Sequence, residues 1–166
     1  ALVGKKKYMS LMNEIFFSGT FNGECLSIAA AIEVIKKIKK KNVIKKILKS
    51  GNFLTESVNQ LITKLNLQDI IELKGKDCWK LLKFNNYKNI KSSEISTYFT
   101  KEMIRYGILI SGSHNICFNH TRDDLVKITS AYKNVLKDLK FQIDSNTLIK
   151  NLNCPVINPV FKPRKY

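Results

Sequence analysis

The chain has 166 residues, 44% of them hydrophobic, and 29 basic against 13 acidic residues give it a formal net charge of +16. A chain of this length and composition is expected to fold as one domain, at most with an extension, which excludes disorder throughout the chain. No apolar run approaches the roughly 20 residues that span a bilayer, so we expect neither a membrane-spanning protein nor a membrane partner.

Lysine supplies almost all of the positive charge. The three arginines are Arg105, Arg122 and Arg164, so the other 26 basic residues are lysines (29 − 3). Proteins that recognise phosphates or bases favour arginine, whose planar group donates two hydrogen bonds at once. The lysine excess therefore predicts solvated faces, and nucleic-acid binding through bare electrostatic attraction ranks below that interpretation.

The four cysteines, Cys25, Cys78, Cys117 and Cys154, show no C-x-x-C spacing. This argues against a zinc ribbon or a thioredoxin-like site, and we expect no metal. Each cysteine has apolar neighbours in the sequence, so all four are predicted to be reduced and to pack as small hydrophobic side chains. A cytoplasmic location fits this pattern.

The first forty residues change character several times. Residues 1–4 are predicted to end a strand, residues 8–12 to form a short helix, and "SGTFNGE" at 18–24 to form a turn before a helix over about 24–40. The front half of that helix is apolar nearly all round, which predicts packing on most sides. Because the chain would enter a strand midway and lacks an initiator methionine, we expect a fragment of a longer chain.

The turn before this helix is a candidate anion site. Gly19 and Thr20 lie in a stretch of small residues that exposes backbone N–H groups and hydroxyls near the positive end of a helix dipole. The simpler alternative, favoured by these residues alone, is that Thr20 or Asn22 caps the helix. Glu24 suits the helix dipole but would repel an anion brought close to it.

The central part of the chain alternates helices and strands. Asn42 is a candidate cap for a helix whose apolar residues recur at helical spacing as far as residue 65. Gly51 falls on the same stripe, which predicts either a close approach to a neighbouring element or a brief break. Two strands, "IIELKG" and "CWKLLKF", follow around the turn "GKD", and then a helix opens at Ser93 and ends at Gly107 in the C′ position.

Beyond this helix, "ILI" at 108–110 and "ICF" at 116–118 are predicted to be short strands on either side of a loop, "SGSHN". Thr121 and Asp124 form a capping-box pattern before a helix whose apolar stripe reaches Leu139. The three prolines of "CPVINPVFKPRKY" predict an extended surface tail. Strands in adjacent pairs predict an α+β layer of antiparallel or mixed strands covered by helices, and not a parallel nucleotide-binding sheet.

His114 and His120 are the only histidines, and their spacing is not a metal-ligand pattern. His120 lies beside a predicted helix cap, where a structural role is expected. His114 lies within "SGSHN" and is the better candidate to face a ligand. The sequence contains no G-x-S-x-G motif and no cysteine with an evident histidine partner, so a nucleophile–base pair is not indicated.

Three blocks in order, "ALVGKKKYM", "FFSGTFNGECLSIAAAIEVI" and "EMIRYGILISGSHNICFNHTRDDL", resemble the carboxy-terminal part of class III aminotransferases, in the branch around glutamate-1-semialdehyde aminomutase. The resemblance implies a fold-type-I enzyme that uses pyridoxal phosphate. Residues 1–41 would be the end of the large domain and the interdomain helix, 42–140 the α+β small domain and 141–166 an extended tail. Gly19, through its N–H, and Thr20, through hydroxyl and N–H, would bind the cofactor phosphate of the partner subunit.

The sequence also departs from the family pattern. The lysine that forms the Schiff base in this family would lie upstream of residue 1, and neither Lys5, Lys6 nor Lys7 occupies its position, so this chain alone is predicted to be inactive. "SGSHN" replaces a proline- and glutamate-containing stretch of the aminomutase. Three residues of this loop are candidates to contact the substrate: Ser113, His114 and Asn115.

The resemblance thus predicts amino-group transfer between an amine or amino acid and a carbonyl acceptor, as part of the intact protein. The expected protein partner is a second copy in a homodimer or a separate lysine-bearing large-domain chain. Two alternatives stay open: glutamate-1-semialdehyde 2,1-aminomutase, an isomerase, and a non-catalytic basic module that binds nucleic acid or a partner protein.

Overall fold

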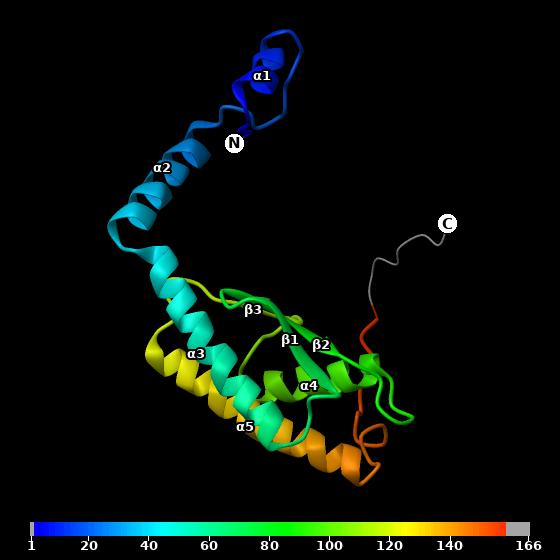
Figure 1. The fold of residues 1–166 in the computed structure, drawn as a ribbon. Coiled ribbons are helices and arrows are strands. Elements are labelled where there is room, and N and C mark those ends of the chain that lie inside the picture. The colour runs from blue at the N-terminus through cyan, green and yellow to red at the C-terminus, as the bar shows by residue number, and fades with distance from the viewer. Residues whose placement is uncertain (1, 159–166) are drawn as a thin grey trace. The chain divides into compact units, whose positions relative to one another are not determined.

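The computed structural model describes residues 2–158, and the chain divides after Asn42 into two compact units, each described here by itself (Figure 1). The first unit contains α1 (Lys6–Met9), the 3-10 helix η1 (Ser10–Asn13) and α2 (Cys25–Lys40). The second unit contains α3 (Val43–Lys64), β1 (Ile71–Lys76), β2 (Trp79–Phe84), α4 (Ser92–Arg105), β3 (Ser113–Asn115) and α5 (Arg122–Asp144).

In the first unit, helix α2 begins and ends where the sequence predicts, and its apolar side chains are exposed. No residue of α2 is buried, and Leu26 and Ile28 are 81% and 50% exposed. Within the first unit nothing covers its apolar front half, so the expected packing on most sides stays a prediction about elements outside this unit. The predicted strand end at residues 1–4 is wrong where the structure describes it, since residues 2–4 pair with no strand.

The second unit is built on a three-stranded antiparallel sheet of order β1-β2-β3. Strands β1 and β2 form the predicted hairpin, in which Lys76 pairs with Trp79 across a two-residue turn. The sheet belongs to an α+β fold, as the paired strands predict.

The third strand is not where the sequence predicts it. Segments 108–110 and 116–118 are not strands, and the strand is formed by Ser113–Asn115, inside the predicted loop. Ile110 and Ile116 are instead 7% and 9% exposed, so they are buried as anchors at the two ends of the strand. Gly112, at φ 71°, turns the chain so that its carbonyl accepts a hydrogen bond from the Leu82 N–H at 2.8 Å.

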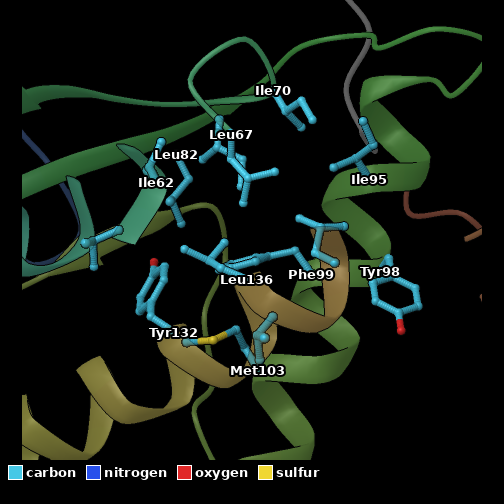
Figure 2. Packing of buried hydrophobic residues seen from close by; sticks show 14 of the residues in the cluster. Ile62, Leu67, Ile70, Leu82, Ile95, Tyr98, Phe99, Met103, Tyr132 and Leu136 are labelled. Carbon is cyan, nitrogen blue, oxygen red and sulfur yellow. The ribbon is translucent and has the colours of Figure 1, made fainter. Parts of the chain in front are cut away.

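Helices α3, α4 and α5 pack on one face of the sheet and enclose the core (Figure 1). Figure 2 shows Phe99 of α4 beside Tyr132 and Leu136 of α5, with Leu82 of β2 nearby. The rings of Phe99 and Tyr132 are tilted, with centroids 5.4 Å apart, an arrangement that aromatic pairs favour. These side chains are almost fully buried, as expected from the apolar stripes of the three helices.

Gly51 confirms the predicted close approach. A Cβ atom at this position would lie 2.2 Å from the carbonyl oxygen of Asp77, which belongs to the turn between β1 and β2. Helix α3 continues through Gly51 without a break. The glycine is therefore required by the packing of helix α3 against the hairpin turn.

The ends of the helices agree with the sequence in some places and not in others. The Thr121 and Asp124 capping box is present, and Gly107 follows α4 with φ 75°. Asn42, the candidate cap of α3, has φ 49° and lies in a left-handed turn instead of the extended conformation usual for an N-cap.

The carboxy-terminal end of the second unit also differs from the prediction. Helix α5 continues to Asp144, and Ile143, Leu148 and Leu152 are buried. Residues 141–152 are therefore packed on the core and are not the start of an extended tail, because the apolar pattern continues past the predicted boundary. Part of the predicted tail, residues 159–166, lies outside the described residues.

Candidate functional site

The turn that contains Gly19 and Thr20 lies in the first unit. Its backbone is held by two hydrogen bonds, from the Asn22 N–H to the Gly19 carbonyl at 3.0 Å and from the Glu24 N–H to the Phe21 carbonyl at 3.2 Å. Among residues 2–158, the N–H groups of Gly19 and Thr20 and the Thr20 hydroxyl have no hydrogen-bond partner. These exposed donors can bind an anion such as a phosphate or carboxylate.

The start of α2 is capped by Glu24, which corrects the expectation that Thr20 or Asn22 caps this helix. The Glu24 carboxylate accepts from the N–H groups of Leu26 at 2.6 Å and Ser27 at 2.7 Å. A hydrogen bond from the Ser27 side chain, together with these backbone bonds, lowers the pKa of Glu24. A charged carboxylate therefore already binds the helix amides, so an external anion at this turn would rely on the Gly19 and Thr20 donors.

The second set of candidates, Ser113, His114 and Asn115, forms strand β3 in the second unit. Ser113 pairs with Leu81 and Asn115 pairs with Trp79. Directly paired residues of an antiparallel ladder point to the same face, and successive residues point to opposite faces. Because Trp79 is 60% and Leu81 49% exposed, Ser113 and Asn115 belong to the open face of the sheet.

His114 lies on the opposite face and is only 5% exposed. Its Nε2 atom lies 2.5 Å from the hydroxyl oxygen of Tyr132, and the two rings meet edge to face. Burial, together with the positive charge of Lys80, lowers the pKa of His114 to about 4, so the imidazole is neutral near pH 7. His114 is therefore a buried residue, whereas Ser113 and Asn115 reach solvent, and all three line one cavity of about 160 Å³.

Nothing among the described residues indicates a metal site. Residues 2–158 contain no group of three histidine, cysteine, aspartate or glutamate side chains that could hold an ion. The Nδ1 atom of His120 accepts a hydrogen bond from the Cys117 N–H at 3.1 Å, which fits the structural role expected of this histidine. Cys25 and Cys117 are free and exposed, so the prediction that all four cysteines pack as hydrophobic side chains is wrong for these two.

A cleft of about 560 Å³ between β2 and α4 was not predicted from the sequence. Its wall on α4 includes Ser92, Ser96 and Thr100, which recur every four residues and therefore share one side of the helix. This spacing in "SSEISTYFT" was the available signal. It was missed because serines at the start of a helix are more often explained as caps.

The chain was compared with known proteins. No family model matches it. It is 23% identical over 143 residues to 3-aminobutyryl-CoA aminotransferase of Cloacimonas acidaminovorans, covering 84% of this chain and 34% of the relative. It is 27% identical over 135 residues to putrescine aminotransferase of Pectobacterium atrosepticum, covering 76% of this chain and 27% of the relative. The chain thus spans about a third of the length of these curated relatives, or less.

Two solved structures are similar in fold. The FumI protein of Sphingopyxis sp. MTA144, in its PLP internal aldimine form, matches with a TM-score of 0.74 and 19% identity over 86% of this chain and 34% of that one. A transaminase with PLP bound matches with a TM-score of 0.74 and 15% identity over 84% of this chain and 34% of that one. The chain therefore has the α+β fold seen in the carboxy-terminal part of such transaminases. No helix within residues 2–158 is long and apolar enough to cross a membrane.

Proposed function

We propose that this chain is the carboxy-terminal part of a pyridoxal-phosphate-dependent aminotransferase. The observation that carries the proposal is the agreement of two independent comparisons. The sequence relatives are aminotransferases, and the fold of most of the chain is that of transaminases, each match covering about a third of the longer protein or less. The reaction of the intact protein would be amino-group transfer between an amine or amino acid and a carbonyl acceptor.

Within that enzyme, we assign Gly19 and Thr20 to the cofactor phosphate of the partner subunit in a homodimer. Two N–H groups and one hydroxyl without partners among the described residues fit a phosphate, which accepts several hydrogen bonds. The capping of α2 by Glu24 means that the turn itself, and not the helix end, supplies these donors. Pyridoxal phosphate, when bound, supplies the electron sink for the chemistry, and this segment holds the phosphate in place.

The three substrate-side candidates of the second unit, Ser113, His114 and Asn115, are proposed to have different roles. Ser113 and Asn115 have access to solvent on the open face of the sheet, beside Trp79, and are the pair that could contact a substrate. For His114 we propose a structural role instead of substrate contact, because its hydrogen bond to Tyr132 holds strand β3 against α5.

The proposed anchor is tested in the intact reading frame, or in this chain combined with a lysine-bearing large-domain chain. Thr20→Ala should weaken pyridoxal phosphate binding about 10- to 100-fold, because a hydrogen bond to a charged group contributes about 1.5–3 kcal/mol. Affinity is measured from the visible absorbance of the bound cofactor. The control is Thr63→Ala, which removes an exposed helical threonine of α3. Equal affinities of the two variants would remove Thr20 from the site.

The intact protein also distinguishes the aminotransferase from the two alternatives, the aminomutase and the basic binding module. Formation of an amino product from a carbonyl acceptor supports the aminotransferase, whereas rearrangement of glutamate 1-semialdehyde without a second substrate supports the aminomutase. A basic nucleic-acid module would instead show binding whose strength falls steeply with salt concentration. This chain alone is proposed to be inactive, so activity without the lysine-bearing part would contradict the proposal.

A further inference from the structure

The cleft between β2 and α4 has no part in the proposed cofactor contacts, and its size is that of a small-molecule site. Its volume of about 560 Å³ lies within the range of roughly 300–1,000 Å³ that is typical of ligand pockets. Figure 1 shows the two elements that form its sides, with α4 running beneath the sheet. The loop before β3 contributes Ser111 and Gly112.

Most of the apolar part of the cleft is formed by residues of the core or packed against it. Phe84 and Phe99 line it with ring centroids 5.3 Å apart, and Phe99 is 1% exposed. Leu82 and Ile110, 8% and 7% exposed, extend this surface, and Ile157, 57% exposed, also lines the cleft. The buried side chains have little freedom to move, so this part of the cleft is preformed and binding to it would cost little side-chain entropy.

Hydroxyl groups form the polar part. The Ser96 hydroxyl donates to the Ser93 carbonyl at 3.1 Å. Within the described range 2–158, the hydroxyls of Ser92, Thr100 and Ser111 make no hydrogen bond and can bind a ligand. These three groups are either donors or acceptors, so they suit an alcohol or a carbonyl equally well.

The described residues that line the cleft are uncharged. Among the described residues, 2–158, its lining contains no lysine, arginine, aspartate, glutamate or histidine, although the chain carries a net charge of +16. A charged ligand would lose its hydration there without gaining an opposite charge, which is costly. We propose that this cleft is a binding site for a small uncharged molecule with an aromatic or branched alkyl body and one alcohol or carbonyl group.

The test uses benzyl alcohol as the probe and the whole chain labelled with ¹⁵N. Saturable shifts should appear at the amides of Ser96, Phe99 and Gly112, with a dissociation constant of about 1–10 mM for so small a molecule. Benzoate and benzylammonium, which have the same ring but carry a charge, should bind at least tenfold more weakly. Absence of saturable shifts at these amides, or equal binding of the charged probes, would overturn the proposal.

Variants locate the site. Ser96→Leu should weaken benzyl alcohol binding at least tenfold by filling the cleft, whereas Ser130→Leu, the same change at an exposed position of α5, should leave it unchanged. Ser111→Leu, outside the helices, is the second cleft variant in case Ser96→Leu does not fold. Binding that survives both cleft variants would place the probe elsewhere and reject the site. No cofactor is added, so the result is independent of the proposed aminotransferase.

Discussion

Protonation of His114 should destabilise the second unit. The imidazole is 5% exposed and its Nε2 atom is hydrogen-bonded to the Tyr132 hydroxyl, while Nδ1 is buried without a hydrogen-bond partner among residues 2–158. Adding a proton would place a positive charge in the core, next to a second N–H group that has no acceptor and near Lys80, whose charge opposes it. The folded state therefore resists a proton that the unfolded chain accepts readily.

The magnitude follows from the two pKa values. Burial lowers the pKa of His114 from 6.5 to about 4 in the folded state. Between these values the unfolded chain binds more protons, so stability is complete above pH 6.5 and is lost as the pH falls through 4. At about 1.4 kcal/mol per pH unit, the limit of this loss is roughly 3 kcal/mol, most of it reached by pH 4.5.

The assay is urea denaturation followed by far-UV circular dichroism, at pH 7.5 and 4.5. His114→Gln keeps a polar partner for the Tyr132 hydroxyl but cannot be protonated, so it should lose roughly 2–3 kcal/mol less stability than the unmodified chain on acidification. Carboxylates titrate in both proteins and cancel in the comparison. His120→Gln is the matched control. It should lose as much stability on acidification as the unmodified chain, because its His114–Tyr132 pair is intact. If His114→Gln and the unmodified chain lost equal stability, the reasoning would be refuted.

Two further predictions concern the packing of α3 and α4. Gly51→Ala should lower the free energy of unfolding by about 3 kcal/mol, because its Cβ would lie 2.2 Å from the Asp77 carbonyl oxygen and the backbone would have to move; denaturation with an unchanged midpoint would contradict this. Tyr98→Phe should cost about 1.5 kcal/mol, because the Tyr98 hydroxyl donates to the Asp138 carboxylate at 2.6 Å in a partly buried hydrogen bond. Tyr106→Phe, near the end of the same helix, is the control, and an equal effect of both changes would mean that the Asp138 bond contributes nothing.

Several features of the fold could be predicted because they depend on residues close together in the chain. The stripe of apolar residues around Gly51 predicted both helix α3 and the close approach at the glycine. The pattern of Thr121 and Asp124 predicted the start of α5 because a capping box is made within one helical turn. The hairpin of β1 and β2 was predicted from two apolar runs separated by a short polar turn.

The errors share a different cause. Ile110 and Ile116 lie in apolar runs typical of strands, yet the strand is formed by the polar residues between them. The reason is that β2 forms its antiparallel backbone hydrogen bonds with Ser113–Asn115. Such pairing joins residues more than thirty positions apart, and local composition does not determine its register. The cap of α2 was missed for a simpler reason: a glutamate is a less common N-cap than threonine or asparagine.

The candidate site shows the same division. From the sequence alone came the exposed turn at Gly19 and Thr20, the α+β class and the resemblance to aminotransferases, since these rest on short motifs in order along the chain. Only the tertiary structure decided that His114 belongs to the core while Asn115 lies on the open face. It also decided that serines and a threonine of α4 line a cleft with aromatic side chains. The reason is physical. Burial and cavities depend on contacts between residues far apart in the chain, and a local stretch of sequence does not determine those contacts.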